Sequence, residues 1–352
     1  MGEKIESETQ SLKRLQYLDL AKAVGMLCVL IGHSFISEKI NTVIYAFHMP
    51  LFFFISGYLC KPQKVALKKI NQKCGHILVP YVITTFFTII LSLIFESGIV
   101  LVKDHKTVFL PNMMKWLEAG VLGLGYRADY RGGGVLPSIG PVWFLLALFW
   151  ATLLLEAYKR LHCSPIITSI IVGVCSIVSF RYFFLPWSIQ EGMVASVFMT
   201  LGYIYRPKEN RIKNQKALRI GIYGFAILYI ICCLHLDKHI DMVKCEYPFG
   251  VIDILGTTMC VITVLLISDM LSSKYYHYGA LDIVGKHTML ILCIHTIEFN
   301  VFPWYIISKI FNILELDRWF GPTQALIRII GAMLIAKMAE RIDLQNVFKG
   351  RY

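Results

Sequence analysis

Residues 17–59 read YLDLAKAVGMLCVLIGHSFISEKINTVIYAFHMPLFFFISGYL and contain two apolar stretches of membrane length. The first carries Asp19 and Lys22 at its start and His33 at its end. The second opens with the sequence FHMP, which contains His48, and closes with Ser56 and a glycine. A charged residue inside a membrane-spanning helix costs about 2.5–3.5 kcal/mol on insertion scales, so such residues are functional candidates by default. This stretch therefore predicts a membrane domain whose first two helices carry chemistry.

Helix geometry places two of these polar residues on one face. Lys22 and His33 are eleven residues apart, which is about 1100° at 100° per residue, or close to three full turns. The two side chains then lie roughly 16 Å apart along the helix axis. One face of the helix would present a cation near one membrane surface and an imidazole near the other.

The composition places the rest of the chain in the same membrane domain. Of 352 residues, 56% are hydrophobic and 16% are charged, against about 45–50% and 25% in ordinary soluble domains. The apolar residues form ten runs of about 18–22 residues, which is the length that a helix needs to cross the hydrocarbon. The predicted fold is an all-α polytopic membrane protein with about ten spans, at 17–36, 43–60, 77–97, 141–158, 165–184, 187–205, 217–235, 249–269, 287–305 and 322–340.

The basic residues predict how the chain is oriented. The net charge of +12 does not indicate nucleic-acid binding, because the lysines and arginines gather at the helix ends. Connections on the side of the N-terminus carry 22 of them, against 11 on the opposite side. This asymmetry predicts that both termini are cytoplasmic. The predicted organisation is a cytoplasmic arm at 1–16, a transmembrane domain at 17–340 and a cytoplasmic tail at 341–352.

Two further features set the limits of this interpretation. The ten cysteines are scattered through apolar runs without CxxC or His/Cys spacing, so no metal site is expected. The longest outer connection, 98–140, holds a polar and aromatic run and three consecutive glycines. Loops of this length are uncommon unless they are functional or disordered.

The ordered motifs of the first sixty residues resemble the membrane acyltransferase-3 family, most closely its branch of fucose 4-O-acetylase-like sugar O-acetyltransferases. The resembling residues are Tyr17-Leu18-Asp19, Lys22, Gly32-His33-Ser34, Phe47-His48-Met49-Pro50-Leu51-Phe52-Phe53 and Ser56-Gly57-Tyr58. The first-helix signature of the family is a basic residue, ten residues and then a histidine. Many members have arginine at the basic position, and the lysine here cannot form the bidentate contact that a guanidinium makes.

The resemblance implies an acyltransferase that takes an acyl group, most simply acetyl, from acyl-CoA in the cytoplasm. The acceptor would be a hydroxyl of a cell-envelope glycan or its lipid-linked precursor. His33 would be the general base, and Lys22, with Asp19 as its i, i+3 partner, would steady the donor end. Two alternatives stay open at these positions: an interfacial histidine satisfied by backbone or water, and a lysine that only snorkels to the membrane surface.

The remaining candidates come from position and from the resemblance together. His48 precedes Pro50 in the first turn of the second helix, at the same outer surface as His33. The resemblance adds Trp143 at the start of a later span, and His295 with Glu298 one turn apart in the ninth. Ser56 is an acceptor-site candidate, although close helix packing explains it equally well. Donor-phosphate candidates are the basic residues before the third span, Lys69, Lys73 and His76.

A second class of function is a polytopic transporter or glycan flippase. It would account for ten spans and for buried charges. Among these are Asp253 and Arg328 near the outer ends of their spans, which we interpret as a buried ion pair. It does not account for the ordered histidine motifs, and it predicts internal repeats that the sequence does not display. The favoured interpretation is therefore a multi-pass enzyme of the plasma or inner membrane that needs no metal or nucleic acid.

Overall fold

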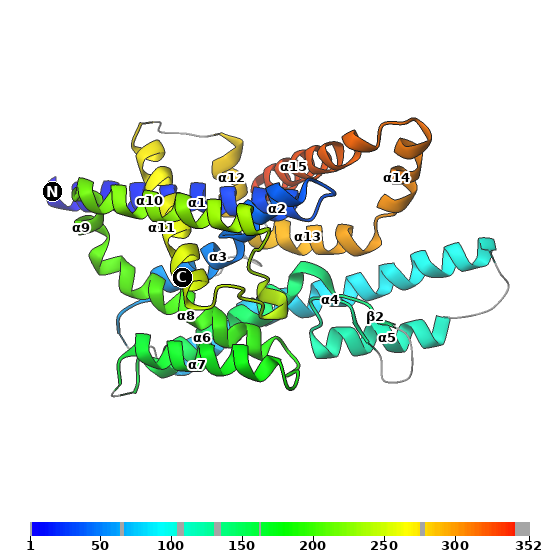
Figure 1. The fold of residues 1–352 in the computed structure, drawn as a ribbon, viewed down its shortest axis with the longest axis horizontal. Helices are drawn as coiled ribbons and strands as arrows, with labels where there is room; N and C mark the ends of the chain where they lie inside the picture. The colour runs from blue at the N-terminus through cyan, green and yellow to red at the C-terminus, as the bar shows by residue number, and fades with distance from the viewer. Residues whose placement is uncertain are drawn as a thin grey trace.

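The computed structural model describes residues 2–63, 67–103, 109–129, 135–161, 163–274 and 279–341, and side chains over a somewhat smaller set. Within these ranges the chain is almost entirely helical (Figure 1). The first half contains α1 (Gly2–Gly32), α2 (Glu38–Tyr45), α3 (His48–Tyr58), α4 (Leu67–Lys103), α5 (Phe109–Leu122), η1 (Gly140–Val142), α6 (Trp143–Tyr158) and α7 (Pro165–Phe180). The second half contains α8 (Ile189–Tyr205), η2 (Arg206–Lys208), α9 (Glu209–Asn214), α10 (Lys216–Leu236), η3 (Met242–Lys244), α11 (Val251–Lys274), α12 (Ala280–Lys286), α13 (Thr288–Val301), α14 (Trp304–Ile313) and α15 (Asp317–Arg341).

Six stretches of helix are long and apolar enough to cross a membrane among the residues described: 38–58, 69–95, 140–158, 216–236, 251–272 and 317–341. A seventh is formed if α13 and α14, which meet at a bend of 61°, count as one span. The remaining predicted spans also overlap helices, but α7 and α8 have only 16 and 17 residues. The all-α membrane fold is therefore confirmed, while six or seven helices of the described residues meet the length and composition of a span, and ten crossings stay a prediction.

Several predicted boundaries differ from the structure. The predicted arm at 1–16 is helical from Gly2 onward and forms the first half of α1. The predicted span at 43–60 is divided into α2 and α3, and α3 begins at His48, as its Pro50 indicates. The predicted tail lies outside the described residues beyond Arg341.

The predicted outer connection 98–140 contains more structure than a loop. α4 continues to Lys103, and α5 follows as a separate helix of 14 residues. Two short antiparallel strands, β1 (Ala128–Asp129) and β2 (Val135–Leu136), then form a hairpin before η1. These segments are too short to span the hydrocarbon, so hydropathy alone could not find them.

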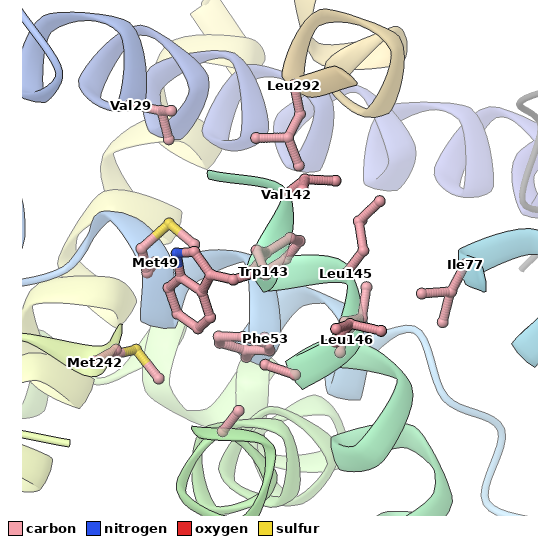
Figure 2. Close-up of a cluster of buried hydrophobic side chains, with 14 of the residues drawn as sticks. Val29, Met49, Phe53, Ile77, Val142, Trp143, Leu145, Leu146, Met242 and Leu292 are labelled. Atoms are coloured by element: carbon pink, nitrogen blue, oxygen red, sulfur yellow. The ribbon is translucent and has the colours of Figure 1, made fainter. Parts of the chain in front are cut away.

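The helices pack through small residues and a buried apolar cluster. A Cβ atom added to Gly57 of α3 would lie 1.7 Å from the carbonyl oxygen of Met199 in α8, and one added to Gly202 would lie 1.9 Å from that of Phe54. Backbones in such contact gain van der Waals energy that lipid cannot match. Beside this contact, Phe53, Trp143 and their neighbours fill the space between α3, α6 and α8, and Met49 belongs to the same buried cluster (Figure 2).

The exposed apolar side chains show where lipid would contact the protein. α4, α7, α10 and α15 each expose several large aliphatic or aromatic residues to the outside of the bundle. Contiguous apolar surfaces of this kind are not tolerated in water by monomeric proteins. The predicted site residues His48 and His295 are instead buried inside the bundle.

Candidate functional site

The predicted catalytic histidine lies in the turn that follows α1. The helix ends at Gly32 rather than at residue 36, and the His33 N–H still donates to the Val29 carbonyl at 3.1 Å. The main-chain position of His33 therefore still continues the helix, on the face that carries Lys22. The following residues, from Ser34 to Ser37, turn the chain into α2.

A cavity of about 840 Å³ opens beside this turn. Its walls come from the end of α1, from α2 and α3, from α5 with the hairpin that follows, from η1 and the start of α6, from residues 240–243, and from α13 to α15. Cavities of about 300–1,000 Å³ hold small-molecule ligands in proteins. His33, His48 and Trp143, all predicted site residues, line this one cavity.

The His33 ring is held by aromatic neighbours and leaves its nitrogens available. Its centroid lies 5.1 Å from the ring of Phe299 and 5.6 Å from that of His295. Neither ring nitrogen forms a hydrogen bond with a residue that the structure describes, and the side chain borders the cavity. An imidazole in this position can accept a proton from a group bound in the cavity.

Arg328 of α15 fixes the main chain of the His33 turn. Its Nη1 donates to the carbonyl oxygen of His33 and to Ser34 Oγ, the latter at 3.2 Å. Its Nε and Nη2 donate to the carboxylate of Glu298 at 3.0–3.1 Å. The indole ring of Trp304 lies 5.3 Å from the guanidinium carbon.

Glu298 joins the other predicted residues of α13 to this group. Its Oε2 accepts a hydrogen bond from His295 Nδ1 at 2.9 Å, and its Oε1 accepts one from the Trp304 indole N–H. The His295 Nε2 atom is buried and has no hydrogen-bond partner among the described residues. Because Nδ1 donates to the carboxylate, Nε2 is the acceptor of the neutral ring. His295 and Glu298 thus lie behind His33 and not on the cavity wall.

His48 has a defined tautomer. Its Nδ1 lies 2.9 Å from the Ile44 carbonyl oxygen, which can only accept, so Nδ1 carries the proton. The edge-to-face ring of Tyr45 lies 4.9 Å away. In the neutral ring Nε2 is then the acceptor, and the side chain lines the cavity.

Other predicted residues lie away from the cavity. Lys22 and Asp19 form their expected ion pair at 2.7 Å, roughly 16 Å along α1 from His33. Ser56 donates to the Phe52 carbonyl within its own helix, beside the α3–α8 contact. The basic candidates Lys69, Lys73 and His76 lie near the start of α4, where Lys69 and His76 are exposed, and none lines the cavity.

The structure also brings residues to the site that sequence reasoning did not assign to it. The predicted ion pair of Asp253 and Arg328 is not found among the described residues, because Arg328 pairs with Glu298 and lines the cavity. Asp253 accepts hydrogen bonds from the Tyr229 hydroxyl at 2.8 Å and from a backbone amide. Trp304 was likewise not among the predicted site residues, and it lines the cavity and contacts Arg328.

Two polar residues of the cavity wall, Gln324 and Asn300, were also missed. The one sequence signal for Gln324 is its position one turn before Arg328, on the same helix face. Among the described side chains, no group of three or more His, Cys, Asp or Glu residues is arranged to hold a metal ion.

Comparison with known proteins adds one result. The family model of an acyltransferase domain matches residues 15–338. No curated protein and no solved structure matches the chain. The matched range includes both the turn at His33 and Arg328, which donates a hydrogen bond to that turn. The chain therefore belongs to the acyltransferase 3 family, as a helical membrane protein whose polar cavity lies beside His33.

Proposed function

We propose that this acyltransferase moves an acyl group, most simply acetyl, from acyl-CoA to a hydroxyl of a cell-envelope glycan or its lipid-linked precursor. The observation that carries the proposal is the His33 ring, which borders the 840 Å³ cavity with no hydrogen-bond partner among the described residues. A general base must reach the proton that it removes, and this ring faces the space where an acceptor would bind.

The proposed reaction uses His33 to activate the acceptor. The hydroxyl oxygen attacks the thioester carbonyl carbon, a carbon–oxygen bond forms, and the hydroxyl proton moves to the imidazole. The carbon–sulfur bond then breaks, and the proton passes to the thiolate sulfur, so the products are an ester and free CoA. The His295 ring lies beside His33, and its Nδ1 is hydrogen-bonded to Glu298. A carboxylate oriented in this way stabilises positive charge on the pair of imidazoles during proton transfer.

The donor end of the site would lie at the other membrane surface. In the proposed orientation both termini are cytoplasmic, the chain crosses the plasma or inner membrane ten times, and Lys22 with Asp19 faces the cytoplasmic half. Lys69, Lys73 and His76 would contact the phosphates of the donor. Labelling of single cysteines at Lys213 and Lys115 tests the orientation, because reagents should reach them from opposite sides of the membrane. Labelling of both from the same side would contradict it.

Transfer itself is tested with purified protein in lipid nanodiscs, [¹⁴C]acetyl-CoA and a panel of methyl hexopyranosides. We expect acceptor-dependent CoA release and labelled ester from the parent protein. His33→Ala should lower this rate about 10²- to 10⁴-fold, because it removes one general base. His235→Ala, at an exposed histidine on α10, is the matched control and should retain full activity. Normal transfer by a correctly inserted His33→Ala protein would exclude His33 as the base.

A further inference from the structure

Gln324 is a buried polar residue of α15 that faces the His33 turn. It is 1% exposed, and it lines the cavity. Gly321, three residues earlier, packs so closely that an added Cβ would lie 1.6 Å from the Phe35 carbonyl oxygen. With Arg328 four residues later, these positions form one helix face. This face of α15 contacts the main chain of the turn that displays His33.

The orientation of the Gln324 amide follows from its one hydrogen bond. The Phe35 backbone N–H lies 3.0 Å from Oε1. A backbone N–H can only donate, so the amide atom that faces it must be the oxygen. The amide nitrogen makes no hydrogen bond to any residue in the described part of the chain, and it is not among the fully buried atoms without partners. Since Gln324 borders the cavity, its NH₂ group is presented there.

Asn300 of α13 is bound to the backbone through its amide nitrogen, whereas Gln324 is bound through its amide oxygen. Its Nδ2 donates to the Thr296 carbonyl at 2.9 Å and to the Ile139 carbonyl at 3.3 Å. Both amide hydrogens are therefore used within the protein, and Oδ1 remains as an acceptor. Asn300 also lines the cavity, next in sequence to the Phe299 ring that contacts His33. The cavity thus carries one fixed donor and one fixed acceptor, each held by backbone atoms.

We propose that Gln324 and Asn300 recognise the acceptor, which is a polyhydroxylated ring. Gln324 donates to one hydroxyl, and Asn300 accepts from another, while a third hydroxyl faces His33. This inference rests on the proposed transfer reaction and names the class of acceptor that the cavity selects. A hydroxyl group both donates and accepts, so a sugar ring satisfies both amides, whereas a carboxylate or phosphate would leave no donor for Asn300 Oδ1.

The rings that line the cavity agree with such an acceptor. Trp116, Trp143, Tyr45 and Trp304 all border it. Aromatic side chains provide large rigid contact areas, and their polar atoms pair with partners at the ring edge. A sugar ring has apolar C–H faces and polar edges, so aromatic walls and fixed amides suit its two kinds of surface.

The test compares parent and variants on acceptors that lack one hydroxyl each. The acceptors are a methyl hexopyranoside and its monodeoxy analogues, with acetyl-CoA as donor. For the parent, loss of the hydroxyl that Gln324 binds should lower kcat/KM about 10- to 100-fold, because a buried donor is left without a partner. In Gln324→Met, the analogue that lacks this hydroxyl and the full sugar should have equal kcat/KM. The decreases in kcat/KM for the other deoxy analogues should stay as in the parent.

Two further variants separate recognition from packing. Gln324→Glu keeps an oxygen for the Phe35 N–H but removes the donor, so we expect a higher acceptor KM, a nearly unchanged kcat and the same lost discrimination. Gln190→Met is the matched control, because Gln190 is a buried glutamine of α8 that bonds the Phe183 carbonyl away from the cavity. This variant should have a lower thermal stability, and its decreases in kcat/KM with the deoxy acceptors should equal those of the parent.

The possible outcomes distinguish a failure of acceptor recognition by Gln324 from a failure of the transfer reaction itself. If Gln324→Met and Gln324→Glu lose rate equally on every analogue, Gln324 only supports the turn and the inference is overturned. The same holds if both variants keep the parent pattern. If the parent releases CoA with none of the sugars, the transfer reaction itself fails, and acceptor recognition fails with it.

Discussion

At the scale of single residues, Arg328 shows how one side chain supports a site without reaching into the reaction. All three of its guanidinium nitrogens are used, two of them on Glu298 and one on the His33 turn. Lysine could not replace it, because an ammonium is a point charge without the planar fork that serves two partners. The residue is thus both half of an ion pair and a positioning group for His33.

We expect Arg328→Met to destabilise the protein because it leaves Glu298 without its charge partner. Breaking a buried pair costs about 3–5 kcal/mol, and the lower end applies here since the Glu298 side chain is 24% exposed. The double variant Arg328→Met/Glu298→Gln should recover part of this loss, yet transfer activity should stay low in both. Thermal unfolding in matched detergent measures the effect. Equal unfolding temperatures of the single variant and the parent would contradict the pairing.

At the scale of elements, the predicted helices agree with the structure where apolar runs are long, and they disagree where helices break. The run at 43–60 was predicted as one span, and residues 38–58 do form one membrane-length stretch. Within it, Phe47, whose φ is −151°, separates α2 from α3. The segment 98–140 contains α5, which hydropathy could not detect because 14 residues are too few to cross the hydrocarbon. Breaks of this kind depend on contacts between segments, which a single sequence does not contain.

The α3–α8 contact gives a prediction at this scale. Gly202→Ala should destabilise the fold by about 1–3 kcal/mol, the usual cost of overpacking, because its Cβ would overlap the Phe54 carbonyl oxygen. Gly331→Ala in α15 is the matched control, since an added Cβ there meets no atom within 4 Å. It should be neutral or stabilising by about 0.5–1 kcal/mol. Apparent unfolding temperatures of the two purified variants, compared with the parent, measure both effects.

At the scale of the whole molecule, a polar network ties distant parts of the chain together. The carboxylate of Glu209 in α9 accepts hydrogen bonds from the hydroxyls of Tyr17 in α1 and Tyr58 in α3, both at 2.5 Å. Lys213 lies 2.8 Å from Glu209 and 2.8 Å from Asp269 of α11. Three elements, α1, α3 and α9, therefore meet at the Glu209 carboxylate, and Lys213 links this group to α11.

This network predicts a loss of stability in acid. Burial alone would raise the pKa of Glu209, but the hydrogen bonds from Lys213, Tyr17 and Tyr58 outweigh it and hold the pKa below its usual 4.5. A carboxyl whose pKa is lower in the folded chain stabilises the fold above its unfolded pKa, and this contribution disappears as the pH falls through the folded value. The unfolding temperature should therefore decrease as the pH is lowered below this usual value of 4.5.

A variant at the same position isolates the contribution of Glu209. Glu209→Gln should be less stable than the parent at neutral pH and should show a smaller decrease in acid. Glu340→Gln changes an exposed carboxylate at the end of α15 and should follow the parent curve. A Glu209→Gln protein with the parent's full acid dependence would show that other groups cause it.

The candidate site was predictable in part, and the reason is physical. His33, His48 and Trp143 belong to local motifs, and the structure brings all three to one cavity. Gln324 and Asn300 have no motif, because their roles depend on backbone atoms about 290 and 160 residues away in the chain. Lys22 lies in a local motif but away from this cavity, and its role at the donor end stays a prediction.

The hydrogen bonds of the His33 turn have one more consequence. Arg328 and Gln324 bind its main-chain carbonyl and amide groups, while the described residues around the imidazole hold it by ring contacts. These main-chain bonds use no atom of the side chain at position 33. Unnatural amino acids with altered basicity or a reactive handle can therefore be incorporated at this position without redesigning the surrounding protein.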